Sequence, residues 1–323
     1  MVEEASLVLT PLPGQGRGHD RDRAPHGARP GREDPLDGPG GDRDDAVLWA
    51  SAFVAIRAIG DSFSPAPMAL LRLTVASVAL TTFALLRRGR SPLPSGRGAL
   101  LVAGYGVLWF AGYTVVLNAA ERHLDAGTAA MLVNIAPILV AVAAGPLLGE
   151  GWPRPLLVGI AVSFAGVTII AIDGAAGRTD RLGLVLGLVT AVLYAAGVLA
   201  QKVALRSTDA LTATWIACLV GTAVLVPFTP AAVAELLRAS APAVAAVVYL
   251  GVFPTAVGFA LWAYALARLN AGVVASTTLS VPAIVVVMSG LLLGELPSLV
   301  ALLGGALCLL GVAVSRRRPR AAG

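Results

Sequence analysis

Six side chains inside apolar segments of this sequence could bind a small amphipathic molecule. They are five aromatic residues and one amide: Trp49, Trp109, Tyr113, Asn134, Tyr194 and Trp262. Aromatic rings offer apolar faces that also attract cations, and an amide both donates and accepts hydrogen bonds. Tyr105, Trp109 and Tyr113 recur every four residues, which places them on one face of a helix. Core packing is the alternative for each aromatic residue, and a hydrogen bond between helices is the alternative for Asn134.

Two prolines would free backbone acceptors in the same kind of segment. Pro137 lacks the amide hydrogen that would bond to the carbonyl of Val133, and Pro282 leaves the carbonyl of Thr278 free in the same way. Such carbonyls suit a polar spot beside a central cavity. We therefore predict hinges at Pro137 and Pro282, with a simple packing kink as the alternative.

The residues that carry enzyme chemistry or bind metals are scarce. The three histidines are His19, His26 and His123, and Cys218 and Cys308 show no CxxC or metal-ligand spacing. A membrane-embedded enzyme would need paired carboxylates, a His/Asp cluster or a nucleophile beside a base. The sequence therefore predicts no catalytic residue, no metal site and no cofactor.

Charged side chains inside apolar runs are also few. Arg72 lies well inside one, and we expect it to extend toward the membrane surface or to bond backbone carbonyls. Glu150 and Glu295 each end an apolar segment, so we interpret them as anchors rather than ligands. We identify no Asp or Glu deep in an apolar run, and a proton relay then has no candidate carboxylate.

The composition indicates that this chain lies in a lipid bilayer. Of its 323 residues, 57% are hydrophobic and only 13% are charged, with a mean hydropathy of +0.80, whereas soluble domains carry about 25% charged residues. The net charge of +5 combines an acidic segment at residues 1–45 with an excess of nine positive charges in residues 46–323. That excess resides in short loops and the C-terminal SRRRPR, a pattern typical of membrane topology and not of nucleic-acid binding. If the N-terminus is cytoplasmic, that side holds twelve Arg and Lys against five, which favours both termini inside.

Ten apolar runs follow a polar N-terminal segment. Residues 1–45 are rich in Gly, Pro, Arg and Asp, so we predict a disordered tail. The apolar runs cover residues 46–59, 68–86, 99–120, 126–148, 155–172, 182–204, 210–228, 244–267, 272–293 and 299–314. They predict an all-α membrane protein with ten transmembrane helices.

The second half of the sequence repeats the first at an offset of 145 residues. AVLWASAFVAIR (46–57) aligns with AVLYAAGVLAQK (191–202), and residues 126–150 match residues 271–295 at eleven of twenty-five positions, all without a gap. Each half contains five predicted crossings, an odd number, so the second half must enter the membrane from the opposite side. The sequence therefore predicts two inverted five-helix repeats, as in many secondary transporters.

The first predicted helix is short. Residues 46–59 would span about 21 Å, whereas a bilayer core is about 30 Å thick. At the repeat offset, DGPGGDRDD (37–45) takes the place of LGLVLGLVT (182–190), and its charges oppose insertion into lipid. We therefore predict a truncated first helix. Either it is a genuine half-helix or the recorded N-terminus is not the natural one, and we favour the second explanation.

Several short motifs, in this order and spacing, resemble the EamA-type drug/metabolite transporters. They are LWASAFVAIR, LLRLTVAS, LNAAERHLDAGTAAML, YALARLNAGVVASTTL and the paired P…LLGE endings. The resemblance covers residues 46–314, with repeats at 46–172 and 182–314 and a basic cytoplasmic tail at 315–323. It implies a ten-helix secondary transporter with cytoplasmic termini and a central cavity lined by helices 1, 3, 4, 6, 8 and 9. Members move amino acids, their derivatives, other metabolites and drugs.

These features together predict a transporter rather than an enzyme. We expect it to export small amphipathic metabolites by alternating access across the bacterial plasma (inner) membrane, where export is implied by the resemblance alone. Its expected partners are the lipid bilayer and a small-molecule substrate, without nucleic acid, and a homo-oligomer is left open. A membrane-embedded enzyme and a non-transporting scaffold are the alternatives.

The topology can be tested by labelling single cysteines from one side of the membrane. In a chain without Cys218 and Cys308, a cysteine at Ser95 should react with an impermeant reagent from the cytoplasmic side and one at Arg178 from the opposite side. This follows because an odd number of crossings separates the two positions. Labelling of both positions from the same face would contradict the inverted arrangement.

Overall fold

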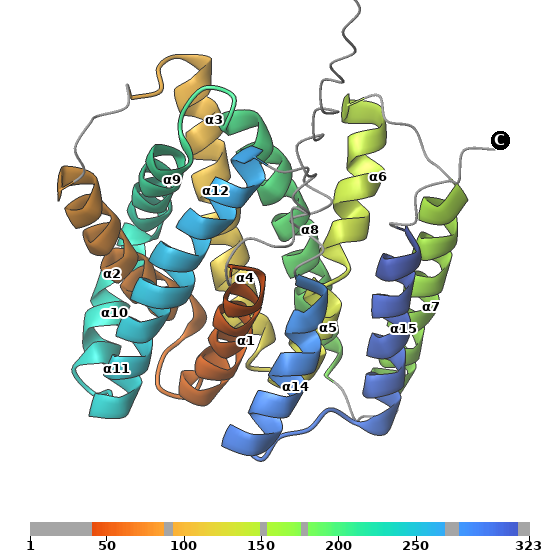
Figure 1. Cartoon of the computed structure of the whole chain (residues 1–323). Helices are drawn as coiled ribbons and strands as arrows, with labels where there is room; N and C mark the ends of the chain where they lie inside the picture. The colour runs from red at the N-terminus through yellow and green to blue at the C-terminus, as the bar shows by residue number, and fades with distance from the viewer. Residues whose placement is uncertain (1–40, 87–92, 149–153, 176–179, 269–277, 316–323) are drawn as a thin grey trace, which may run out of the picture. The chain divides into compact units, whose positions relative to one another are not determined.

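The computed structural model describes residues 41–86, 93–148, 154–175, 180–268 and 278–315. Within these ranges every regular element is helical and no strand occurs, which confirms the all-α class (Figure 1). The helices belong to one compact unit, Gly40–Gly323. The polar tail before residue 41, Glu150 and the C-terminal arginines from Arg316 onward lie outside the described residues.

The helices follow one another in chain order in each half. The first half contains α1 (Gly41–Ile59), α2 (Pro65–Leu86), α3 (Arg97–Tyr105), the π-helix η1 (Gly106–Tyr113), α4 (Thr114–Ala120), α5 (Ala126–Val133), α6 (Ala136–Leu148) and α7 (Arg154–Ala175). The second half contains α8 (Arg181–Ala204), α9 (Ala210–Leu225), η2 (Val226–Phe228), α10 (Thr229–Leu236), α11 (Ala241–Leu250), the π-helix η3 (Gly251–Gly258), α12 (Phe259–Arg268), η4 (Thr278–Ser280), α14 (Val281–Leu292) and α15 (Leu299–Ser315). The elements α3, η1 and α4 are continuous, and so are α11, η3 and α12.

Five helical segments in the described residues are long and apolar enough to cross a membrane. They are Pro65–Leu86, Arg97–Ala120, Arg181–Ala204, Ala210–Leu236 and Ala241–Arg268. Shorter apolar helices cover Ala46–Ile59, Ala126–Val140, Leu157–Ile170, Val281–Leu292 and Leu299–Ser315. Each predicted apolar run thus contains helix, while the number of membrane crossings stays a prediction.

The first helix begins five residues before its apolar part. α1 starts at Gly41, so the charged sequence GDRDD is helical, and its apolar part is Ala46–Ile59. A helix of 19 residues spans about 28 Å, close to the bilayer core of about 30 Å. The predicted truncation therefore applies to the apolar surface and not to the helical backbone.

The fourth apolar run is divided into two helices. α5 ends at Val133, Asn134 caps it, and α6 starts one residue before Pro137. In the second half, the short 3-10 helix η4 precedes α14, whose second residue is Pro282. Proline fits the first turn of a helix because the amide there has no partner within the helix. Pro137 therefore marks the place where a helix restarts, and Pro282 lies in the first turn of α14.

The two π-helices lie 145 residues apart, at the offset of the sequence repeat. In η3, Pro254 cannot donate a hydrogen bond to the carbonyl of Leu250, and the hydroxyl of Thr255 donates to it instead at 2.7 Å. A side-chain hydroxyl thus replaces the missing amide hydrogen. The irregular turn of η3 thus keeps this carbonyl paired.

Helices from the two halves also meet at side chains that are 145 residues apart. Ser77 and Thr222 share a hydrogen bond of 2.9 Å. The hydroxyl of Ser163 donates to the carbonyl of Cys308 at 2.9 Å, and the Cys308 thiol donates to the carbonyl of Ser163 at 3.4 Å. Cys308 and Cys218 are both buried, so the cysteines are packed thiols inside the helix bundle.

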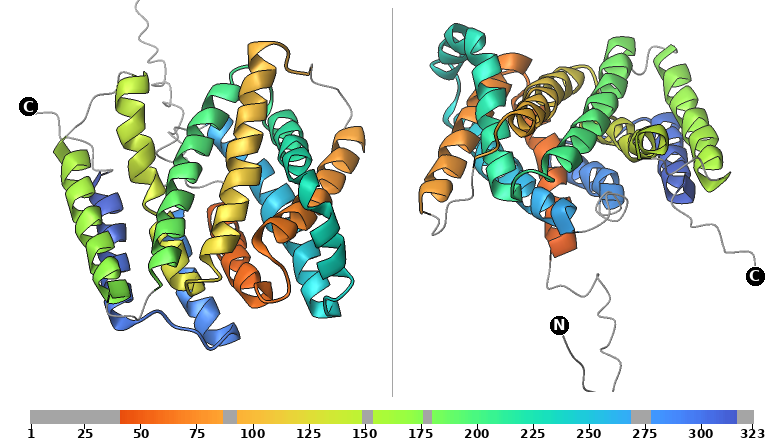
Figure 2. Two further views of the ribbon diagram at one scale, coloured as in Figure 1. Left: turned by 180° about the vertical axis from the view of Figure 1, so that it is seen from behind. Right: turned by 90° about the horizontal axis from the view of Figure 1, so that it is seen from above.

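The helices α7 and α15 lie side by side and approach closely through glycines (Figure 2). A Cβ added at Gly166 would lie 2.5 Å from the carbonyl oxygen of Gly304, and one at Gly311 would lie 2.6 Å from that of Gly159. In lipid, helices associate mainly through such close backbone packing, because apolar side chains gain little by leaving lipid for protein.

Arg72 is buried inside the helix bundle, which corrects the expectation that it extends to the membrane surface. Its side chain is 2% exposed, and its Nε donates to the hydroxyl of Thr255 at 2.5 Å. The same hydroxyl donates to the Leu250 carbonyl, so the π-helix presents an oriented acceptor to the guanidinium. A buried cation requires such partners because its desolvation is costly.

Glycine packing between α7 and α15 predicts the effect of one added methyl group. Gly166→Ala should lower the melting temperature in detergent, because its Cβ meets the backbone of α15. Gly104→Ala is the matched control, since no atom lies within 4 Å of a Cβ added there, and it should leave the melting temperature unchanged or raise it. Equal effects of the two substitutions would contradict the proposed close packing.

The bond between Arg72 and the π-helix predicts the effect of a nearly isosteric change. Thr255→Val should lower the free energy of unfolding by about 2 kcal/mol, because the charged Arg72 loses its acceptor in a buried place. Denaturation in mixed micelles, followed by circular dichroism, measures the effect. Thr168→Val on α7 is the control, because Thr168 is exposed and bonds only to the carbonyl of Phe164 in its own helix. An effect no larger than that of the control would show that the acceptor is dispensable.

Candidate functional site

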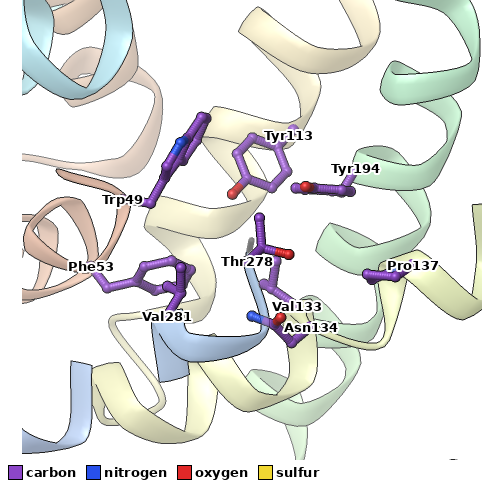
Figure 3. Close-up of a pocket in the computed structure, with 9 residues that line it drawn as sticks. All are labelled: Trp49, Phe53, Tyr113, Val133, Asn134, Pro137, Tyr194, Thr278 and Val281. Carbon is purple, nitrogen blue, oxygen red and sulfur yellow. The ribbon is translucent and has the colours of Figure 1, made fainter. Parts of the chain in front are cut away.

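A small cavity of about 20 Å³, partly open to its surroundings, lies between helices of both halves. Its walls come from α1, η1, the junction of α5 and α6, α8, η4 and α14. The lining residues are Trp49, Phe53, Tyr113, Val133, Asn134, Pro137, Tyr194, Thr278 and Val281. Figure 3 shows the rings of Trp49, Tyr113 and Tyr194 along one edge, with Asn134 at the opposite edge and Thr278 between.

Four of the six predicted binding residues meet at this cavity. They are Trp49, Tyr113, Asn134 and Tyr194, and the predicted hinge residue Pro137 lies beside them. The lining residues that the sequence analysis did not select as ligands are Phe53, Val133, Thr278 and Val281. A signal was present for three: Phe53 follows Trp49 by one helical turn, and Val133 and Thr278 lie four residues before the two prolines.

The remaining predicted residues, Trp109 and Trp262, lie behind the cavity wall. Trp109 is completely buried, and its ring centroid lies 5.1 Å from that of Tyr194 and 6.4 Å from that of Tyr113. The ring centroid of Trp262 lies 6.3 Å from that of Trp49. Both tryptophans therefore hold the lining rings in place. Pro282 is not among the lining residues, although its neighbour Val281 is.

A buried amide fixes Trp262 in this position. The indole Nε1 of Trp262 donates to Oε1 of Gln201 at 3.1 Å, and Nε2 of Gln201 donates to the hydroxyl of Tyr105 at 2.9 Å. This chain of hydrogen bonds joins α12, α8 and α3. It satisfies polar atoms that would be costly to leave unpaired away from water.

Asn134 presents a free acceptor at the helix break. Its Nδ2 donates to the carbonyl of Ala130 in its own helix at 3.2 Å, whereas its Oδ1 is buried without a hydrogen-bond partner. The predicted alternative of a bond between helices is therefore wrong. A buried acceptor without a partner costs free energy, which a ligand that donates a hydrogen bond would recover.

An ion pair joins the two halves one helical turn beyond the cavity. Trp49, Phe53 and Arg57 lie four residues apart on one face of α1. The guanidinium of Arg57 contacts the carboxylate of Glu295 through Nε at 2.8 Å and through Nη2 at 2.9 Å. Glu295 follows α14 and anchors that end, as predicted, but it does so as a bidentate partner of Arg57.

The carboxyl of Glu121 is buried at the same end, which corrects the expectation that this chain has no buried carboxylate. Glu121 caps α4, is 1% exposed, and has no hydrogen-bond partner for either carboxylate oxygen. Burial raises its pKa well above the ordinary value, and the cations of Arg57 and Arg72 oppose this shift. The sequence did not predict the burial of Glu121, because Glu121 precedes Arg122 and His123, and three such residues in a row indicate a solvated loop.

The other titratable pair at this end is exposed. His123 contacts Asp180 at 2.6 Å, between its Nδ1 and a carboxylate oxygen. Asp180 caps α8, and the amide of Leu182 and the ring of His123 lower its pKa. Among the described residues no group of three His, Cys, Asp or Glu side chains could hold a metal ion.

Comparison with known proteins shows which family this sequence resembles. The EamA-like transporter family matches residues 45–172 and 181–317. A probable terminal-alkyne amino-acid exporter of Streptantibioticus cattleyicolor is 39% identical over 279 residues, covering 84% of this chain and 91% of that protein. A probable amino-acid metabolite efflux pump of Escherichia coli is 27% identical, covering 83% of this chain and 91% of that protein.

Two further similarities agree with this result. An uncharacterised transporter of Bacillus subtilis is 31% identical, covering 82% of this chain and 86% of that protein. A solved crystal structure matches with a TM-score of 0.58 at 20% identity, covering 85% of this chain and 94% of the other, which supports the fold alone. The relatives bear the names of transporters and not of enzymes. This chain therefore belongs to the EamA-like transporter family.

Proposed function

We propose that this protein is a secondary transporter that exports small amphipathic amino acids or their derivatives from the bacterial cytoplasm. The observation that carries this proposal is the cavity between the two halves, with aromatic walls and a free amide acceptor. The relatives named as an amino-acid exporter and an amino-acid metabolite efflux pump support the same substrate class. Their substrates are assigned to this chain as part of the proposal only.

The chemistry of the lining residues suits a molecule with one cationic and one apolar part. An ammonium group is attracted to the faces of Trp49, Tyr113 and Tyr194, and it can donate a hydrogen bond to Oδ1 of Asn134. An apolar side chain can pack against Phe53 and Val281. At about 20 Å³ the cavity has room for about one water molecule in this conformation, so a substrate would enter only when the two halves move apart.

The proposed architecture is ten membrane crossings in two inverted repeats, residues 46–172 and 182–314, with both termini in the cytoplasm. Contacts that exchange under the 145-residue offset support it. A Cβ at Gly106 would lie 2.5 Å from the carbonyl oxygen of Ala217, and one at Gly251 would lie 2.7 Å from that of Arg72. Such reciprocal pairs are expected where a two-fold axis in the membrane plane relates the halves.

Alternating access would then operate by movement of one half relative to the other around the cavity. We propose that the bond between Arg57 and Glu295 closes one end of the cavity, because it joins α1 of the first half to the segment after α14 of the second. Pro137 and Pro282 are the proposed hinges. The partners in this proposal are the lipid bilayer and the substrate. The polar and aromatic groups that line the small cavity favour a transporter over a non-transporting scaffold.

Removal of the free acceptor tests the binding role of the cavity. In proteoliposomes, Asn134→Ala should reduce the exchange of L-propargylglycine, an amino acid with a terminal alkyne, by about tenfold. This corresponds to the loss of about 1.4 kcal/mol from one hydrogen bond. The melting temperature should change little, because the other bond of Asn134 is within its own helix.

Thr168→Ala is the matched control, since Thr168 also bonds to a carbonyl four residues earlier but lies exposed on α7. It should leave exchange unchanged. L-leucine and L-phenylalanine extend the substrate panel. Exchange by Asn134→Ala equal to that of the control would remove Asn134 from the binding site, and wild-type protein that exchanges nothing in the panel above empty vesicles would contradict the proposed substrate class.

A further inference from the structure

The surroundings of the Glu121 carboxyl favour its neutral, protonated form in this conformation. It is 1% exposed, and neither oxygen accepts a hydrogen bond. An ionised carboxylate without hydrogen-bond partners is costly to bury, whereas the protonated form loses far less hydration. The surroundings of Glu121 therefore favour a bound proton.

Charged groups face Glu121 from several elements, and none is bonded to its carboxylate. Arg57 on α1 and Arg72 on α2 favour the ionised form, whereas Asp125 at the start of α5 and Glu295 after α14 disfavour it. Tyr113 is also within electrostatic range. The carboxylate at the start of α8 belongs to Asp180, which is paired with His123.

Arg57 and Arg72 differ in how many of their guanidinium donors already have hydrogen-bond partners. Arg57 uses Nε and Nη2 for Glu295, while its Nη1 donates to the backbone carbonyl of Glu121 at 3.0 Å. Arg72 uses Nε for Thr255, but its Nη1 is buried without a partner. If Glu121 lost its proton, its new charge would compete with Glu295 for Arg57 and would attract the free donor of Arg72.

The repeat shows that this carboxylate is special to one end of the molecule. Lys202 and Leu266 stand 145 residues after Arg57 and Glu121, and Nζ of Lys202 donates to the carbonyl of Leu266 at 2.9 Å. The cation-to-carbonyl bond is thus present in both halves. The carboxyl is present only in the first half, where the second half has Leu266.

We propose that Glu121 is the proton-binding site through which a proton gradient drives this transporter. The inference rests on the proposed function. A proton from solution binds one carboxylate oxygen of Glu121 and leaves Arg57 with Glu295, which keeps this end closed. When the proton leaves, Arg57 turns toward Glu121, the bond to Glu295 weakens and this end opens. By linkage, protonation stabilises the closed end, because buried Glu121 binds the proton more tightly than solvated Glu121.

Infrared spectroscopy tests the proton site without any substrate. The full chain in lipid nanodiscs should show the carbonyl stretch of a buried protonated carboxyl at neutral pH, and this band should disappear in alkaline solution. Glu121→Gln should lack the band. Asp61→Asn is the matched control, because Asp61 is an exposed carboxylate at the same end that also acts on Arg57, and it should keep the band. Absence of the band in the wild-type protein would overturn the proton site.

Transport in proteoliposomes tests the coupling. Wild-type protein and Asp61→Asn should accumulate L-propargylglycine against its gradient when a pH gradient is imposed. Glu121→Gln, which mimics the neutral carboxyl, should accumulate more than tenfold less L-propargylglycine than the wild type. It should still exchange L-propargylglycine when no pH gradient is imposed. Accumulation by Glu121→Gln equal to the wild type would overturn the proposal, and so would wild-type exchange that a pH gradient does not drive.

The possible failures are distinguishable. If the wild type shows neither exchange nor accumulation of the panel, the proposed substrate class and the coupling fail together, while the infrared band still tests the proton site. If Glu121→Gln does not fold, Glu121→Asp replaces it. A shortened carboxyl should move the pH at which the infrared band disappears, whereas a merely structural role would leave that pH unchanged.

Discussion

The backbone of this protein is arranged by the lack of water in the hydrocarbon core, where every amide and carbonyl needs a partner within the protein. Continuous helices meet this requirement by themselves. The irregular turns found here occur where other groups replace the missing bonds. In η3 the hydroxyl of Thr255 serves the carbonyl that Pro254 leaves free. At the junction of α5 and α6, Val133, Asn134 and Pro137 line the cavity.

The same constraint governs the charges. Arg72 is buried because η3 offers it an oriented hydroxyl. Arg57 has a carboxylate and a backbone carbonyl as partners. Glu121 is buried and its carboxylate has no hydrogen-bond donor, so loss of a proton there would change the partners of both arginines. The irregular backbone that accommodates the π-helix thus also determines which cation remains available near the carboxylate.

Much of the fold followed from periodicity and from the internal repeat. Apolar runs located the helices, and the helix restart at Pro137 followed from its missing amide hydrogen. The aromatic pattern and the repeat identified three aromatic cavity residues, but they could not separate the residues that line the cavity from those behind it. Trp109 and Tyr113 share a helix face, and only the approach of α8, where Gly197 comes close to the Trp109 ring, decides which ring is exposed to the cavity. Glu121 was missed because a charged residue beside Arg122 and His123 indicates a loop, whereas its burial depends on α1 and α2.

The internal repeat accounts for the arrangement of the helices, and departures from the repeat account for the polar groups of the cavity. Trp49 and Tyr194 are repeat partners, as are Val133 and Thr278, and all four line the cavity. Tyr113 and Asn134 have no such partners: the position 145 residues after Tyr113 is Gly258, and the one after Asn134 is Leu279. A symmetric cavity would present the same groups in both halves and could not orient a molecule with different ends. Because the amide of Asn134 comes from one half only, an amphipathic substrate would have a preferred orientation. For the same reason the proposed proton site lies at one end, so the two directions of transport would not be equivalent.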